Sequence, residues 1–239
     1  MIRRMKCTLS ILAMVLSIAI TALAGSTTFR SSRRQAIVRE NPDAPRFNGT
    51  SVVGIRPATP FLYFDLLSSW LPHAGPGHWP DADMIPLGHI CQRNCDVRPD
   101  RWTRFSRDEQ VTLLSLWALA PSPLMLGMNL PDNDEWTTSL LTNAEVLAVN
   151  QDPLGLAARR DTDTAQNIEI WMKQLSDQSL AVGFFNRTDS AAKIELLWQR
   201  LGFASDPQVR DLWARKDLGR QKQFAAELAP HGCTLLRAQ

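Results

Sequence analysis

The sequence has almost no excess charge of either sign. It holds 26 Lys and Arg against 24 Asp and Glu, a formal net charge of +2. Three of the cations, Arg3, Arg4 and Lys6, lie in an N-terminal leader that we expect to be removed, which takes the mature chain from +2 to −1. Nucleic-acid binding draws on a strong basic field. We therefore expect no nucleic-acid partner.

Cysteine is scarce, with four in 239 residues, which limits disulfides and metal sites. Cys7 lies in the leader. Cys91 and Cys95 lie in a polar loop and are a candidate disulfide in an oxidising compartment. With His89 they make only three candidate metal ligands, so we expect no zinc site and no other cofactor. Cys233 lies in an apolar stretch and is expected to be a small buried residue.

Charge is absent from Thr8 to Ala24, directly after the basic N-terminus. The stretch ends in Ala22-Leu23-Ala24, the small-x-small pattern of a signal-peptidase site. An uncleaved anchor is the alternative, because the stretch is just long enough to span a bilayer. We favour a signal peptide over residues 1–24, a secreted or periplasmic protein, and no stable membrane association after cleavage.

Residues 25–60 have no helix or strand periodicity. Six arginines are mixed there with Ser, Thr, Pro and Gly. A nucleic-acid-binding arm is one interpretation, but no aromatic residues alternate with the arginines to stack on bases. We interpret the segment as a solvated, irregular, Arg-rich linker.

Residues 61–155 have the pattern of an α/β fold. Phe61–Trp70 is apolar at helical spacing and is followed by Pro72. Ser106 and Glu109 form a capping box that opens a second helix. Leu124–Leu130 is a continuous apolar run, which predicts a parallel strand buried on both faces. A second capping box, Thr142 with Glu145, opens a further helix. Such alternation is typical of an α/β barrel or a layered sheet.

Residues 156–239 alternate apolar and polar side chains in several short segments separated by turns. The apolar residues of the first segment are Ile168, Ile170 and Met172. Those of the second are Leu180, Val182 and Phe184, and those of the third are Ile194, Leu196 and Trp198. This pattern predicts an antiparallel β-sandwich as a separate domain.

Several motifs occur in the order and spacing of one enzyme family. The first is Gly75-Pro76-Gly77-His78-Trp79-Pro80-Asp81-Ala82-Asp83-Met84, and others include Glu145–Gly155, Val209–Trp213 and Pro230-His231-Gly232. Together they resemble glycoside hydrolase family 27, the α-galactosidases and α-N-acetylgalactosaminidases, over residues 66–239. The resemblance implies a partial (β/α)8 barrel over residues 61–155, followed by the sandwich. The chain, at 239 residues, is shorter than the roughly 250 residues that a complete barrel alone typically needs.

The resemblance also assigns two substrate-binding residues. In the family, the second Asp of the glycine-rich motif and the Met after it line the galactose pocket, which corresponds to Asp83 and Met84 at the C-terminal end of the seventh barrel strand. The carboxylate would accept sugar hydroxyl hydrogen bonds and the thioether would pack on the apolar face of the ring. The alternative is that Asp81 and Asp83 only cap a turn. Trp79, Trp117 and Trp171 are expected to be core residues.

The family's catalytic motifs are absent from the sequence. A retaining glycosidase needs two carboxylates, a nucleophile and an acid/base, about 5–5.5 Å apart. The family's nucleophile lies in a K-Y-D-x-C motif that does not occur here, and Tyr63-Phe64-Asp65 is not its equivalent because it lies too close to Gly75. We expect no catalytic residue and a loss of about six βα units.

Two functions stay open at this point. The chain is either the tail of a retaining α-galactosidase that acts on terminal α-galactosides or related carbohydrates, or a non-catalytic secreted remnant or carbohydrate-interaction module. The family selects galactose or N-acetylgalactosamine in the part of the barrel that is missing here.

Overall fold

The computed structural model describes residues 62–90, 101–161 and 168–239. All of these residues belong to one compact unit, Asn41–Gln239. The candidate disulfide between Cys91 and Cys95 lies outside the described residues, as do the expected leader and linker. Among the helices described, none is long and apolar enough to cross a membrane.

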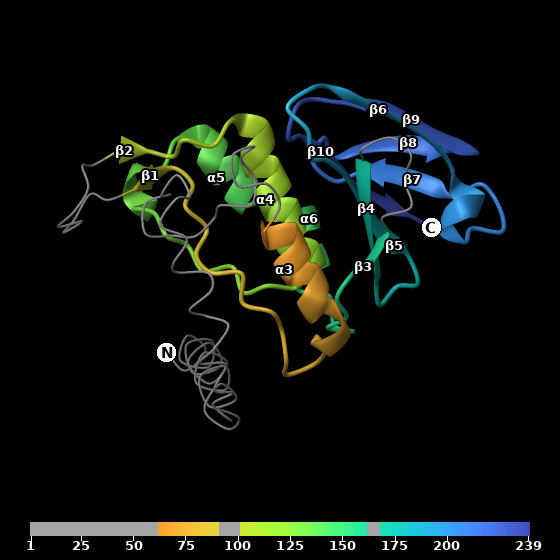
Figure 1. Cartoon of the computed structure of the whole chain (residues 1–239), viewed down its shortest axis with the longest axis horizontal. Helices are drawn as coiled ribbons and strands as arrows, with labels where there is room; N and C mark the ends of the chain where they lie inside the picture. The colour runs from red at the N-terminus through yellow and green to blue at the C-terminus, as the bar shows by residue number, and fades with distance from the viewer. Residues whose placement is uncertain (1–61, 91–100, 162–167) are drawn as a thin grey trace, which may run out of the picture. The chain divides into compact units, whose positions relative to one another are not determined.

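Among the described residues, four α-helices and two single turns of 3-10 helix precede the sandwich. Their bounds are α3 Leu62–Trp70, η1 Leu71–His73, α4 Arg107–Leu119, η2 Leu130–Asp132, α5 Glu135–Leu141 and α6 Ala144–Asn150 (Figure 1). The capping box that opens α4 is confirmed: the Ser106 hydroxyl accepts from the Glu109 amide at 3.2 Å, and the Glu109 carboxylate accepts from the Ser106 amide at 2.7 Å.

The N-cap predicted for α6, Thr142, lies one residue before the observed one. The capping residue is Asn143, whose side-chain oxygen accepts from the amides of Glu145 and Val146. Thr142 instead donates its hydroxyl to the Thr138 carbonyl at the end of α5. An Asn side chain reaches these amides as well as the side chain of a Thr would, and its own amide group adds a bond to the Leu212 carbonyl at 3.0 Å.

The strands form a hairpin and two further antiparallel sheets. The hairpin pairs β1 His89–Ile90 with β2 Arg101–Trp102. A six-stranded sheet has the order β3-β4-β5-β10-β7-β8, and a two-stranded sheet pairs β6 with β9. Their bounds are β3 Arg159–Asp161, β4 Ile168–Gln174, β5 Leu180–Asn186, β6 Ala192–Leu197, β7 Gln208–Asp211, β8 Lys216–Arg220, β9 Gln223–Leu228 and β10 Cys233–Ala238. The predicted sandwich is confirmed, except that Trp198 begins the 3-10 turn η3 Trp198–Leu201 rather than extending β6.

The two faces of the six-stranded sheet support two different apolar cores. Because side chains alternate along a strand, Ile170, Met172 and Phe184 face the β6–β9 pair and pack in one buried cluster with Trp198 and Phe224. Their sequence neighbours on the other face, including Trp171 and Phe185, join the helices in a second cluster. The boundary at residue 155 stays a prediction, because this second cluster contains residues from both sides of it.

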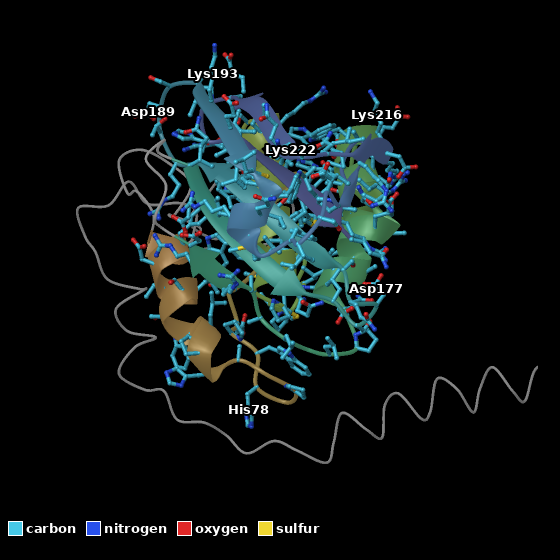
Figure 2. All side chains as sticks on the ribbon, turned by 90° about the vertical axis from the view of Figure 1, so that its right-hand side faces the viewer. His78, Asp177, Asp189, Lys193, Lys216 and Lys222 are labelled. Atoms are coloured by element: carbon cyan, nitrogen blue, oxygen red, sulfur yellow. The ribbon has the colours of Figure 1, made fainter. Side chains whose placement is uncertain are left out.

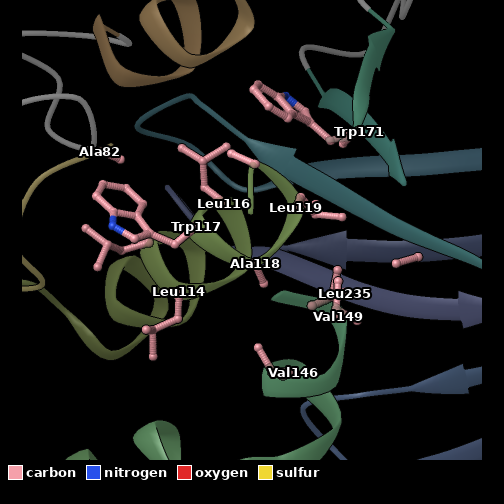
Figure 3. Close-up of a cluster of buried hydrophobic side chains, with 14 of the residues drawn as sticks. Ala82, Leu114, Leu116, Trp117, Ala118, Leu119, Val146, Val149, Trp171 and Leu235 are labelled. Carbon is pink, nitrogen blue, oxygen red and sulfur yellow. The ribbon is translucent and has the colours of Figure 1, made fainter. Parts of the chain in front are cut away.

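Helix α4 lies at the centre of the second cluster. Its buried residues pack with Val146 and Val149 of α6 and with Trp171 and Leu235 of the sheet (Figure 3). The helix contacts β4, β5 and β10. A glycine permits this close approach: a Cβ built at Gly183 of β5 would lie 2.6 Å from a methyl of Leu119. Helix α4 therefore packs closely against the sheet, and its side chains leave no space for a larger residue at Gly183.

The outer surface of the sandwich carries both charge signs. Lys193, Lys216 and Lys222 project outward, and so do Asp177 and Asp189 (Figure 2). Lys193 also forms an exposed ion pair with Glu227 across the β6–β9 pair, at 3.8 Å. Such pairs contribute little to stability.

The prediction of a buried strand over Leu124–Leu130 is wrong. The segment makes one parallel bridge, between Leu126 and Ile85, and is otherwise irregular. Met125, Leu126 and Leu130 are 57%, 40% and 55% exposed. A parallel strand is buried only when neighbours cover both its edges and both its faces, and the described residues supply a neighbour on one edge alone. The apolar sequence is thus present without the surroundings that would make it a core strand.

Candidate functional site

The glycine-rich segment forms a turn followed by an extended loop. The backbones of Gly75 and His78 exchange two hydrogen bonds of 2.8 Å, and Gly77 between them has a positive φ of 84°, a conformation that favours glycine. Trp79 then donates its indole N–H to the Gly155 carbonyl at 3.1 Å. The loop is thereby attached to the segment that follows α6.

Trp79 is not a core residue, contrary to the sequence prediction. Its side chain is 47% exposed, whereas Trp117 and Trp171 are fully buried as predicted. The single hydrogen bond to Gly155 satisfies the indole N–H and leaves much of the ring in solvent. An apolar sequence context did not distinguish these two situations.

The two carboxylates of the loop flank a buried alanine. Ala82 is 2% exposed, and its amide donates to the Ser122 hydroxyl at 2.9 Å. Asp81 and Asp83 on either side are exposed. Asp83 has a φ of 71°, which Asp tolerates better than most residues. Ser122 therefore fixes the point from which both carboxylates project.

The turn-capping role weighed for these carboxylates is present. Asp81 accepts from the Asp83 amide at 2.9 Å, and one oxygen of Asp83 accepts from the Met84 amide at 2.7 Å. The second oxygen of Asp83 has no hydrogen-bond partner among the described residues, and Met84 beside it is 41% exposed. An acceptor and a thioether are thus available side by side, as sugar binding would require, and the binding role of Asp83 and Met84 stays a prediction.

The loop lies before the parallel pairing rather than at its C-terminal end. Ile85 donates to the Met125 carbonyl at 2.7 Å and accepts from the Gly127 amide at 3.0 Å, and both contacts follow Asp83 in the chain. A Cβ built at Gly127 would lie 3.1 Å from the Cβ of Met84, so glycine allows Met84 to pack against the neighbouring segment. The sequence placed the loop by family analogy and did not fix where the pairing would begin.

Asp65 takes part in an ion-pair network, and its exclusion as the catalytic nucleophile stays a prediction. Its carboxylate contacts Arg160 at 2.7 Å and Arg187 at 3.5 Å, and both guanidinium groups also contact the buried Glu169. Arg187 additionally stacks on Phe64, 4.9 Å from its ring centroid. The network joins α3 to the sheet and has a structural purpose.

The glycine-rich loop carries two exposed carboxylates two residues apart. Asp81 and Asp83 are neighbours in one loop and cannot readily lie on opposite sides of a glycosidic bond. No group of three or more His, Cys, Asp or Glu in the described ranges is placed to hold a metal ion. The two carboxylates can accept hydrogen bonds from hydroxyl groups, and the expectation that the chain holds no catalytic residue stays a prediction.

Two polar residues that the sequence analysis did not single out hold the helices to the sheet. Lys173 of β4 is fully buried and donates to the Ala118 and Val149 carbonyls at the ends of α4 and α6. Burial lowers the pKa of its ammonium group to about 8. His231 contacts Glu109 at 3.2 Å and Asp189 at 2.9 Å. For the first, no sequence signal was available, because Lys173 lies on the face of the alternating strand that was read as polar.

Cys233 is a free thiol, and burial raises its pKa to about 11. Its sulfur donates to the Ser115 hydroxyl at 3.3 Å, and Ser115 also accepts from the Trp213 indole at 2.8 Å. The sequence predicted a small buried residue, whereas the side chain is only partly buried and packs against the cluster around α4.

Comparison with known proteins places the two parts of the chain in one family. Residues 62–152 match the model of α-galactosidase A, and residues 165–238 match that of the α-galactosidase C-terminal β-sandwich domain. The α-galactosidase of Oryza sativa subsp. japonica is 34% identical over 168 residues, which are 70% of this chain and 37% of that protein. Arabidopsis thaliana α-galactosidase 2 is 33% identical over 73% of this chain and 41% of its own length.

Solved structures agree with the sequence matches. The GH27 β-L-arabinopyranosidase of Geobacillus stearothermophilus superposes with a TM-score of 0.68 and 42% identity, over 74% of this chain and 41% of that one. The chain therefore spans about two fifths of the length of these relatives. The ordered motifs, the sandwich and these matches together show that residues 62–238 belong to glycoside hydrolase family 27. They form an α-galactosidase-like C-terminal part of the barrel with its β-sandwich.

Proposed function

We propose that this chain contributes one wall of the sugar pocket of an α-galactosidase-type glycoside hydrolase, through Asp83 and Met84. The observation that carries the proposal is the match of residues 62–152 to the family model, which includes the loop where Asp83 keeps an acceptor oxygen available. Charged acceptors bind hydroxyl groups more strongly than neutral ones do.

The ligand class is a terminal pyranoside with the configuration of galactose. The relatives are named for α-galactosides and for β-L-arabinopyranosides. β-L-arabinopyranose has the ring hydroxyl configuration of α-D-galactose and lacks only its hydroxymethyl group. A loop that binds ring hydroxyls and one ring face is compatible with both. With most of the pocket wall outside the described residues, the affinity should be about 1 mM or weaker.

The same proposal includes export and the absence of activity from the chain alone. The basic N-terminus, the uncharged Thr8–Ala24 stretch and the Ala22-Leu23-Ala24 site support a secreted or periplasmic location. Loss of a nucleophile alone removes several orders of magnitude of rate. We therefore expect no enzymatic turnover of an α-galactoside by this chain, in keeping with a retaining enzyme that lacks both catalytic carboxylates.

Galactose binding by the full chain tests the proposal. Ligand-observed NMR with D-galactose and L-arabinose should show weak binding that Asp83→Asn reduces at least fivefold, since Asn tolerates the positive φ but removes the charge. Asp206→Asn, an exposed carboxylate on the sandwich, is the matched control and should bind as the parent chain does. Hydrolysis of an aryl α-galactoside is measured alongside.

Two outcomes would contradict the proposal. Equal sugar binding by the parent and Asp83→Asn would leave Asp83 as a turn residue and favour the non-catalytic remnant. Robust turnover that Asp83→Asn abolishes would mean that the catalytic carboxylates are in this chain after all.

A further inference from the structure

Asp83 has a backbone conformation that needs support from its surroundings. Its φ of 71° lies in the left-handed region, which residues other than glycine seldom adopt unless neighbouring contacts hold them there. Two hydrogen bonds reach the loop on either side of the Asp83 Cα. The Ala82 amide donates to the Ser122 hydroxyl at 2.9 Å, and the Asp83 carbonyl accepts from the Trp117 indole at 3.4 Å. Ser122 and Trp117 therefore hold the backbone from which the carboxylate projects.

Ser122 is a buried residue in a short segment that has few backbone donors. Pro121 and Pro123 on either side of it have no N–H. The amide of Ser122 is therefore the one backbone donor of these three residues, and it donates to the Trp117 carbonyl at 3.0 Å. The position of the Ser122 hydroxyl thus depends on that carbonyl and on the group that binds the carbonyl of Ser122 itself.

Asn150, the last residue of α6, binds both of these carbonyls. Its side-chain amide nitrogen donates to the Trp117 carbonyl at 3.2 Å and to the Ser122 carbonyl at 2.9 Å. An Asn side-chain amide has two protons to donate, so these two bonds use both of them. One side chain therefore fastens the two residues that hold the loop at Ala82 and Asp83.

The contacts of Asn150 go beyond the joining of two helices. Lys173 already joins α4 to α6 through a carbonyl of each, whereas Asn150 also reaches Ser122, which lies past the end of α4 and meets the loop. We propose that Asn150 is a positioning residue, which sets the Asp83 carboxylate for sugar binding by way of Ser122 and Trp117. This rests on the proposed function, in which Asp83 binds the sugar, and it requires no contact between Asn150 and the sugar.

Asn150→Ala in the full-length chain tests the proposal, with Asn143→Ala as the matched control. Asn143 lies at the opposite end of the same helix and donates to the Leu212 carbonyl rather than toward the loop. D-galactose binding is measured by NMR titration at a temperature at which the parent chain and both variants are folded. We expect Asn150→Ala to weaken binding at least threefold and Asn143→Ala to leave it unchanged.

Hydrogen exchange of the Ala82 amide reports on the loop without any sugar. Its rate is taken relative to that of the slowest core amides, which separates local release of the loop from a change in global stability. Asn150→Ala should raise this ratio at least tenfold, as should Ser122→Ala, which removes the acceptor of the Ala82 amide. Asn143→Ala should leave the ratio unchanged. Asn150→Ser, whose hydroxyl has a single proton to donate, replaces Asn150→Ala if that variant does not fold, and should show a smaller change of the same sign.

A double-mutant cycle between Asn150→Ala and Ser122→Ala tests whether the first residue acts through the second. Residues that act through a shared contact have non-additive effects, whereas independent residues have additive ones. The double variant should therefore lose at least twofold less galactose affinity than the product of the two single losses. A merely structural role of Asn150 predicts no such coupling in affinity.

Three results would overturn the proposal. They are unchanged sugar binding or unchanged relative exchange of Ala82 in Asn150→Ala, multiplicative losses in the double variant, and an equal loss of binding in Asn143→Ala. A failure of the proposed function is distinguishable from these. If the parent chain bound no sugar while Asn150→Ala still released the Ala82 amide, the proposed function alone would be contradicted, and the positioning of Asp83 by Asn150 would be supported.

Discussion

Lys173 shows how much a single residue can couple the helices to the sheet. Its ammonium group is buried between the ends of α4 and α6, where helix carbonyls carry partial negative charge. Those carbonyls lack partners within their own helices. One side chain from β4 therefore caps the C-terminal ends of two helices. This requires the removal of an ammonium group from water, which is energetically unfavourable.

The lowered pKa of Lys173 gives a stability prediction with a definite sign. The folded pKa is about 8 against an ordinary value of 10.5. Between these values the unfolded chain holds a proton that the folded chain has released, so raising the pH favours folding, by roughly 3 kcal/mol at most. The stability of the parent chain relative to Lys173→Met should rise from pH 8 to pH 10.5 in urea unfolding. Lys216→Met, an exposed lysine, is the control, and parallel pH curves for parent and Lys173→Met would refute the account.

His231 joins three segments at one imidazole ring. It contacts the buried Glu109 of the α4 capping box and the exposed Asp189, and its own carbonyl accepts from Thr112 at 2.7 Å. His231→Ala should destabilise the fold by about 1–3 kcal/mol, because it leaves a buried carboxylate with one partner fewer. Asp189→Ala should cost less than about 1 kcal/mol, because its carboxylate is exposed. Equal unfolding midpoints for the two variants would argue against this ranking.

At the scale of elements, the helix caps provide a direct comparison between the sequence prediction and the structure. Asn143 caps α6 and also bonds to Leu212, whereas Thr142 is exposed. We expect Asn143→Ala to cost about 2 kcal/mol and Thr142→Ala well below 1 kcal/mol. Thermal or urea unfolding of the two variants measures the difference. A larger loss for Thr142→Ala would restore the capping box that the sequence suggested.

The elements that sequence reasoning predicted are those that local rules determine. α3, the capping box of α4, and the alternating strands β4, β5 and β6 depend on spacing, caps and turns. The errors have a different cause. Within the described residues, Leu124–Leu130 has a neighbouring strand segment along one edge only. Trp79 depends on a contact with Gly155, 76 residues away. A local sequence pattern does not determine contacts between residues that are far apart in the chain.

The candidate site was predictable only in part, for the same reason. The residues Asp83 and Met84 came from the resemblance, and the structure shows that they are accessible. Periodicity could not show that Ser122 would hold Ala82 from 40 residues away, or that Asp83 would adopt a positive φ. These two features decide where the carboxylates project.

At the scale of the molecule, the shared core predicts that the helices and the sandwich unfold together. Phe64, Trp117 and Leu119 pack in one cluster with Trp171, Phe185 and Leu235 of the sheet. Loss of the helices would expose these sheet residues to water, at a cost of roughly 1.5–3 kcal/mol for each large apolar side chain. The two-domain division expected at residue 155 predicts the opposite, a sandwich that survives when the helices are lost.

Native-state hydrogen exchange separates these possibilities. Amides at the centres of α4 and β5 should exchange through the same global opening and give equal unfolding free energies. Gly183→Ala places a methyl 2.6 Å from Leu119, so it should lower both free energies together, by about 1–3 kcal/mol. Gly202→Ala, at a positive-φ turn with open space around it, is a control for strain outside this interface. If α4 lost protection in Gly183→Ala while β5 kept its full value, or if proteolysis released an intact fragment from about residue 156, the sandwich would be an independent domain.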